Sequence, residues 1–375
     1  MKRKITAAAA FALCVAMGVC ACSPSEKEDT FTGKEKEELA WQPNLDRISP
    51  EVYADISNLD LKPGTYISVI GKREGTAYWS EVQAGVEQAA EDINKHLGYK
   101  GEDKIKVLYN APADSENIDE QVNILDEELA RYPDVIAVAS VAEDASAVQF
   151  DLAAENGIAV VAFDSRNNYQ GIQCTCMTDN VAAAKEGARK MSEAIEEKGE
   201  ILLIAQDSVS GTAKERTKAV TEEITANYPN VKVVETIYMD QFDDLKMQAA
   251  ADELGVTKEQ LAEWTVESSG QTPADEGEEA MSEEVRTKLE DIRAVADGMT
   301  DADVVARYME KYPNLKGCFA VNADAVLLAM DAFETAENEE DIVLMGFDAG
   351  KEQIAALKKR NDRWVLLCKN PFGMG

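Results

Sequence analysis

Polar and charged side chains recur directly after short apolar segments of this sequence. Asp164 and Asp348 each follow a Phe, Asn322 follows a third apolar segment, and Arg216 lies shortly after a fourth. Carboxylates, amides and guanidinium groups are planar and can form two hydrogen bonds at once, as neighbouring hydroxyl groups of a small ligand require. Open α/β sheets bind ligands at the carboxyl ends of their strands. We therefore expect these side chains to form a polar ligand site.

The usual catalytic signatures are absent. The sequence contains no G-x-S-x-G, H-E-x-x-H or G-x-x-x-x-G-K-[ST] motif, and the segment from Gly71 to Gly75 lacks the third glycine of a dinucleotide fingerprint. The single histidine, His96, argues against a His-dependent triad or a His-rich metal centre. We therefore predict no enzymatic activity, no cofactor and no metal site. The enzymatic alternative is that Asp164 and Asp348 act as a carboxylate pair.

Two kinds of segment alternate from residue 62 onward and indicate the elements that position these side chains. Short runs rich in β-branched residues predict strands, and amphipathic stretches rich in Ala and Glu predict helices. The predicted strands are residues 66–70, 105–109, 135–139, 159–163, 201–204, 231–234, 317–321 and 342–345. Helical spacing is found in residues 79–94, 117–132, 145–156 and 182–198. This alternation predicts an α/β fold with parallel sheets covered by helices on both faces.

The length of 375 residues and the hydrophobic content of 45% predict two domains with substantial cores. We place lobe 1 at residues 62–178, lobe 2 at residues 179–369, and a crossover back to lobe 1 at residues 370–375. Residues 252–301 interrupt the alternation and carry 15 acidic but only four basic residues. We interpret them as an acidic helical insertion in lobe 2. The alternative, a cation site, lacks the ladder of Asp and Asn ligands around a glycine.

The N-terminus has the features of a bacterial export signal. Basic residues at positions 2 to 4 precede an apolar run that is too short for a membrane span of about 20 residues. The following Val-Cys-Ala-Cys resembles a lipobox, in which Cys22 is the lipidated residue. We therefore predict a signal peptide at residues 1–21, an acidic tether at 22–61, and an extracytoplasmic protein anchored to the bacterial cell membrane by lipid. An ordinary cleaved signal and a retained anchor are the alternatives.

The charge of the chain excludes one class of partner. The formal net charge is −33. A surface this acidic repels the phosphates of nucleic acids and the headgroups of anionic lipids, so we predict no nucleic-acid partner.

Four cysteines remain outside the signal segment, and they are Cys174, Cys176, Cys318 and Cys368. A disulfide is permitted outside the cytoplasm, but a bridge between Cys174 and Cys176 would be strained. We interpret the four as free buried thiols. The alternative, a metal site built on the C-x-C pair, lacks further ligands at a suitable spacing.

Eight short motifs occur in a defined order along residues 62–375. They are Thr76-Ala77-Tyr78-Trp79, Phe163-Asp164-Ser165-Arg166, Thr178-Asp179-Asn180, the segment Gly211 to Arg216, the segment Asp240 to Asp243, the segment Val321 to Asp324, Gly346-Phe347-Asp348 and Lys369-Asn370-Pro371. In order and spacing they resemble the type I periplasmic sugar-binding proteins, the family of the ribose- and glucose/galactose-binding proteins of ABC importers. Each motif alone is unspecific, because an Asp or Asn after a strand is often a helix cap. The resemblance implies two Rossmann-like lobes joined by a hinge.

The resemblance also implies which residues hold the ligand. Tyr78 or Trp79 would stack on one face of a sugar ring and Phe242 on the other, with ordinary core packing as the alternative for each. The implied hydrogen-bonding residues are Asp164, Arg166, Arg216, Asn322, Asp348 and Lys369. If Arg166, Arg216 and Lys369 all face the pocket, they would favour a ligand with negative charge.

The function implied by the resemblance is the capture of a sugar or sugar-like ligand by hinge closure. The ligand would then pass to the permease and ATPase of an ABC importer. A sensor that signals to a chemoreceptor or a sensor kinase is the alternative. A cytoplasmic repressor shares the bilobal fold, but the export signal and the lack of an N-terminal helix-turn-helix argue against it. Members of the family continue beyond the Asn-Pro motif, so we expect this sequence to be truncated at its C-terminus.

Overall fold

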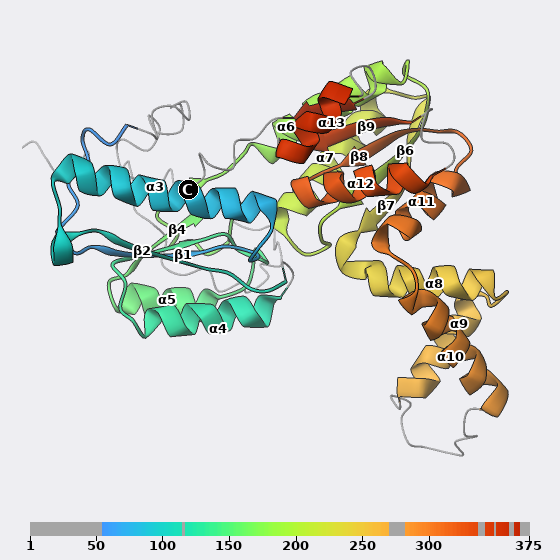
Figure 1. The fold of residues 1–375 in the computed structure, drawn as a ribbon, viewed down its shortest axis with the longest axis horizontal. Helices are drawn as coiled ribbons and strands as arrows, with labels where there is room; N and C mark the ends of the chain where they lie inside the picture. The colour runs from blue at the N-terminus through green and yellow to red at the C-terminus, as the bar shows by residue number, and fades with distance from the viewer. Residues whose placement is uncertain are drawn as a thin grey trace, which may run out of the picture. The chain divides into compact units, whose positions relative to one another are not determined.

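The computed structural model describes residues 55–114, 117–269, 282–336, 342–348, 350–359 and 364–367. Within these ranges the chain forms two parallel sheets of five strands, with helices on both faces of each (Figure 1). The predicted α/β fold is therefore confirmed. The signal peptide, Cys22, most of the tether, Cys368, Lys369 and the crossover at 370–375 lie outside the described residues. No helix in the described ranges is long and apolar enough to cross a bilayer.

The first sheet has the strand order β2-β1-β3-β4-β5. Its strands are β1 (Tyr66–Ile70), β2 (Lys106–Asn110), β3 (Val135–Val138), β4 (Ala159–Phe163) and β5 (Thr175–Cys176), and its helices are α3 (Ala77–Leu97), α4 (Ile118–Leu129) and α5 (Ala147–Glu155). A 3₁₀ turn, η1 (Gly101–Asp103), precedes β2. Figure 1 shows α3 on one face of this sheet and α4 and α5 on the other.

The second sheet has the order β10-β9-β8-β6-β7. Its strands are β6 (Gly199–Ala205), β7 (Val231–Tyr238), β8 (Leu315–Ala320), β9 (Val343–Phe347) and β10 (Trp364–Leu367). Its helices are α6 (Asn180–Ala194), α7 (Gly211–Asn227), α8 (Phe242–Glu253), α9 (Lys258–Ser269), α10 (Glu283–Asp297), α11 (Asp301–Lys311), α12 (Ala323–Thr335) and α13 (Lys351–Lys359), with the 3₁₀ turn η2 (Met239–Gln241) before α8.

The alternation of side chains along β6 explains why this sheet is covered on both faces. Ile201 and Leu203 pack with α6 and α7, whereas Leu202 and Ile204 pack with α11 and α12. Successive strand residues point to opposite faces, so a strand that is buried on both sides is apolar throughout. The same division occurs in the first sheet, where Val69 packs with α3 and Ile70 packs with α4 and α5.

The two sheets share one strand order. From one edge to the other, the first sheet reads β5-β4-β3-β1-β2 and the second reads β10-β9-β8-β6-β7, so the strands follow the same order relative to their order in the chain. Consequently β1 corresponds to β6, β3 to β8, and β4 to β9. Residues that follow corresponding strands occupy corresponding positions at the carboxyl edge of each sheet.

Residues 252–301 contain all of α9 and α10. Leu261, Leu289 and Ile292 pack there with Ala250 and Ala251 of α8 in a small apolar cluster of their own. This cluster is separate from the cores on the faces of the second sheet.

The cysteines within the described residues differ in burial. Cys318 of β8 is buried, and this burial raises the pKa of its thiol. Cys174 is exposed and Cys176 is half-buried, so the interpretation of all the cysteines as buried thiols is wrong for this pair. No cluster of three or more His, Cys, Asp or Glu side chains in the described ranges is arranged to hold a metal ion.

Candidate functional site

A pocket lies at the carboxyl ends of strands from both sheets. Six of the residues singled out from the sequence line it, and they are Tyr78, Trp79, Asp164, Arg216, Asn322 and Asp348. They come from segments that are up to 270 positions apart in the chain. The fold therefore brings together most of the polar side chains that follow its strands.

Asp164 and Asp348 occupy corresponding positions in the two sheets. Asp164 directly follows β4 and Asp348 directly follows β9. Both residues have a left-handed backbone, with φ of 57° and 70°, and both are buried. Such a conformation is uncommon for residues other than glycine and is found mostly where the surrounding structure enforces it, often at functional sites. Each sheet thus delivers one carboxylate to the pocket by the same backbone turn.

Tyr78 connects the first helix to Asp164. Its hydroxyl donates a hydrogen bond of 2.6 Å to Oδ1 of Asp164. Burial, followed by the nearby carboxylates of Asp164 and Asp348, raises the pKa of Tyr78 well above its usual value. The phenol therefore stays protonated at neutral pH. Its hydroxyl donates to the Asp164 carboxylate and so fixes the orientation of that carboxylate.

Trp79 is positioned by the start of α3. The Thr76 hydroxyl accepts a hydrogen bond from the backbone N–H of Trp79 at 3.3 Å and so caps the helix. The indole packs edge-to-face against Tyr78 at 5.2 Å and Phe163 at 6.3 Å between ring centroids. Only 4% of its surface is exposed, yet it contributes to the wall of the pocket. Trp79 therefore packs in the core and also lines the pocket.

Arg216 is the most buried cation of the pocket, with 2% of its surface exposed. It lies in the second turn of α7, whose first residues are capped by the Ser210 hydroxyl. Its Nε donates to Oδ1 of Asn180 at 2.9 Å, and a terminal nitrogen donates to the carbonyl of Val321. The guanidinium lies 4.2 Å from the ring centroid of Phe347. These contacts fix its plane beside the pocket.

Asn322 stands at the N-cap position of α12, but its side chain makes no cap hydrogen bond. Instead, Oδ2 of Asp348 accepts from the backbone N–H of Ala323 at 2.9 Å. The Asn322 amide donates to Oε1 of Gln206 at 2.9 Å. The other atoms of this amide pair, Oδ1 of Asn322 and Nε2 of Gln206, are buried and have no hydrogen-bond partner among the described residues. They form an acceptor and a donor that remain to be satisfied.

Two of the singled-out residues lie elsewhere. Phe242, at the start of α8, is buried in the core beside Ile204 and Ile237 and does not line the pocket. Arg166 is exposed and is engaged by two carboxylates, Glu143 at 2.6 Å and Glu215 at 2.9 Å. In the described part of the chain, the three-cation arrangement that would favour a negatively charged ligand does not form at the pocket.

The periplasmic binding protein domain matches residues 67–261, just over half of the chain. The chain belongs to this family. Solved structures of similar fold include an ABC transporter solute-binding protein from Burkholderia graminis in complex with D-arabinose, which is 19% identical. That match covers 84% of this chain and 86% of the other, with a TM-score of 0.61. No curated protein matches the chain.

Two further structures share the fold of this periplasmic binding protein. A carbohydrate transporter solute-binding protein from Agrobacterium radiobacter, in complex with D-arabinose, is 19% identical over 83% of this chain and 84% of the other, with a TM-score of 0.58. An ABC transporter solute-binding protein from Agrobacterium vitis, with bound D-fucose, is 21% identical over 83% and 85%, with a TM-score of 0.57. At these identities the likeness establishes the fold.

The pocket of this periplasmic binding protein also contains polar residues that were not predicted to bind the ligand. They are Lys72, Gln206, Ser210, Thr212 and Asp324. Burial raises the pKa of Asp324, and the charge of Arg73 opposes that rise. Lys72 and Gln206 lie within two residues of the ends of β1 and β6. Their position after a strand, the signal used for Asp164, would have identified both.

Proposed function

We propose that this periplasmic binding protein captures a neutral sugar in the pocket and delivers it to the permease and ATPase of an ABC importer. The observation that carries the proposal is the convergence of Asp164, Arg216, Asn322 and Asp348 beside the indole of Trp79. We further propose that residues 62–178 and 179–369 act as two lobes around this pocket.

The chemistry of a sugar matches these side chains. Each hydroxyl of a sugar both donates and accepts hydrogen bonds, and the C–H groups of the ring form apolar faces. Carboxylates accept from hydroxyls, the guanidinium donates to them, and an aromatic surface covers the ring. The unsatisfied amide atoms of Gln206 and Asn322 supply one further donor and one further acceptor.

The charge of the pocket favours a neutral ligand. Asp164, Asp324 and Asp348 supply three acidic groups, and Arg216 and Lys72 supply two basic groups. A second line of support comes from relatives of similar fold, which hold D-arabinose, D-fucose and D-allose. These observations support a monosaccharide as the class of ligand.

Hinge closure would couple capture to delivery. Groups from both sheets contact the ligand together only when the two lobes meet, so a bound sugar favours the closed arrangement. A permease that recognises the closed arrangement would then accept only the loaded protein.

We also propose that Cys22 carries a lipid that anchors the protein outside the cytoplasm, as the lipobox-like segment indicates. Metabolic labelling of the bacterial host with a fatty acid is expected to mark the wild-type protein and not the Cys22→Ser variant. The variant should also leave the membrane fraction. Equal labelling of the Cys20→Ser variant and the wild type is the matched control, and labelling that survives Cys22→Ser would contradict the anchor.

Tryptophan fluorescence tests the capture of sugars. Titration with a panel of neutral aldoses, ketoses and polyols is expected to change the emission of the wild-type protein in a saturable manner, because Trp79 lines the pocket. The change should disappear in Trp79→Phe and persist in Trp264→Phe, since Trp264 packs in the separate cluster of α8, α9 and α10. The absence of any response in fluorescence and in melting temperature across the panel would refute the proposed function.

A further inference from the structure

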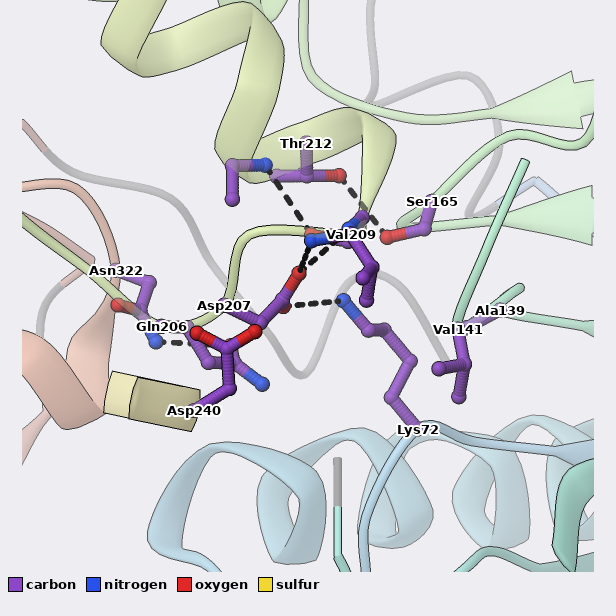
Figure 2. Close-up of polar contacts among 12 residues, drawn as sticks. Lys72, Ala139, Val141, Ser165, Gln206, Asp207, Val209, Thr212, Asp240 and Asn322 are labelled. Atoms are coloured by element: carbon purple, nitrogen blue, oxygen red, sulfur yellow. Dashed lines mark hydrogen bonds and ion pairs between the residues drawn. The ribbon is translucent and has the colours of Figure 1, made fainter. Parts of the chain in front are cut away.

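Lys72 and Asp207 form a buried ion pair at the edge of the pocket. Nζ of Lys72 lies 3.6 Å from Oδ2 of Asp207, and their side chains are 4% and 0% exposed. Lys72 follows β1 of the first sheet, and Asp207 follows the corresponding strand β6 of the second. Figure 2 shows the Lys72 side chain reaching toward the Asp207 carboxylate. The pair therefore joins the two sheets at matched positions.

The two carboxylate oxygens of Asp207 face different parts of the chain. Its Oδ1 accepts hydrogen bonds from the backbone N–H groups of Val209 and Ser210, which fixes the turn that leads into α7. Its Oδ2 is buried, and in the described part of the chain it accepts no hydrogen bond. This oxygen faces the ammonium of Lys72, so the ion pair with Lys72 is its main interaction among the described residues.

Lys72 would carry an unbalanced charge without this carboxylate. No second carboxylate among the described residues forms an ion pair with its ammonium. Two other acids of the pocket have contacts of their own, since Asp164 accepts from Tyr78 and Asp348 accepts from the backbone of Ala323. A buried ammonium that loses its partner is strongly unfavourable, because desolvation is no longer offset by attraction.

These observations bear on which ligand can complete the site, because Lys72 lines the pocket. With Asp207 in place, the ammonium is already neutralised and a neutral sugar can be enclosed beside it. A sugar acid would bring a second carboxylate to an ammonium whose charge Asp207 already balances. Without Asp207, the carboxylate of a sugar acid would itself become the partner of Lys72.

We propose that Asp207 is a selectivity residue that makes the pocket accept neutral sugars in preference to sugar acids, by neutralising Lys72 across the two lobes. This inference rests on the proposed capture of sugars. Asp207 acts through Lys72 and has no contact with the ligand in this scheme.

The test uses the full mature chain and three matched pairs of probes: D-glucose with D-glucuronate, D-galactose with D-galacturonate, and D-arabinose with D-arabinonate. Affinities are measured by calorimetry. In Asp207→Asn, whose side-chain oxygen still accepts from Val209 and Ser210, the Kd of the preferred neutral sugar should rise at least about tenfold. The Kd of its acid form should fall by a similar factor, which a purely structural role of Asp207 would not produce.

Two further variants separate charge from folding. The double variant Lys72→Met with Asp207→Asn removes both charges, and the neutral sugar should regain an affinity within about threefold of the wild type. The matched control is Lys218→Met with Glu222→Gln, an exposed ion pair on α7 whose loss should leave every affinity unchanged.

The outcomes are distinct. A wild-type chain that binds none of the probes or of the wider panel refutes the proposed function and this inference with it. A wild-type chain that binds a neutral sugar, while Asp207→Asn binds that sugar equally well and still rejects its acid, overturns the role of Asp207 and leaves the proposed function standing.

Discussion

Replacing Arg216 with Ala is expected to weaken binding of the captured sugar by at least about 100-fold. The guanidinium is the planar donor of the pocket, and it is held in place by Asn180, the carbonyl of Val321 and the ring of Phe347. Its removal would take away the hydrogen bonds that we propose it donates to the ligand, and would leave the buried acceptors of Asn180 and Val321 without this donor. The free energy of unfolding should therefore also fall, by about 2–5 kcal/mol.

Calorimetry and thermal unfolding of Arg216→Ala measure these two effects. Arg216→Lys retains the charge but not the planar fork, so it should fold more stably than the Ala variant and still bind at least about tenfold more weakly than the wild type. Arg189→Ala on the exposed face of α6 is the control and should leave the affinity unchanged. An Arg216→Ala protein that binds the sugar as the wild type does would remove this residue from the site.

The second large effect is expected at Asp348. Asp348→Asn should reduce the affinity for the sugar by about 10- to 100-fold, because a hydrogen bond from a sugar hydroxyl to a carboxylate is stronger than one to an amide. The free energy of unfolding should change by less than about 1 kcal/mol, since Asn also tolerates the left-handed backbone that this position requires. Equilibrium urea unfolding together with calorimetry measures both quantities.

Comparison with two further variants separates the carboxylate from the backbone. Asp348→Gly relieves the positive φ but removes the group that accepts from Ala323, so it should bind no better than Asp348→Asn. Glu197→Gln is the matched control, because Glu197 is an exposed acid that also has a positive φ, of 55°. If Glu197→Gln and Asp348→Asn have the same small effect on affinity, the Asp348 carboxylate does not contact the ligand.

Much of the fold follows from local patterns in the sequence. Eight of the strands overlap short apolar runs. The central strands β6 and β8 are mostly apolar because helices cover both faces of the sheet, whereas the edge strands β2 and β7 also contain charged residues. The remaining two, β5 and β10, were not predicted, because they are short: β5 spans two residues and β10 spans four, although the residues of β10 are all apolar. Their strand conformation depends on the neighbours β4 and β9 with which they pair.

The site was predictable only in part because pairing partners lie far apart in the sequence. Arg166 has the residue type and the position of a ligand-binding side chain, but Glu143 and Glu215 engage it. Phe242 is the first residue of α8, and its ring packs in the core with Ile204 and Ile237. Lys72 follows a strand and could have been selected on that ground, but its ion pair depends on Asp207, 135 positions later.

The matched left-handed turns after β4 and β9 have a consequence for how selectivity can change. Each sheet presents a carboxylate to the pocket from the same kind of turn, so the proposed site consists of two halves that are encoded far apart in the chain. If both carboxylates contact the sugar, a substitution beside Asp164 should alter recognition at one edge of the ligand and leave the other edge unchanged. We would then expect specificity to change one half of the site at a time.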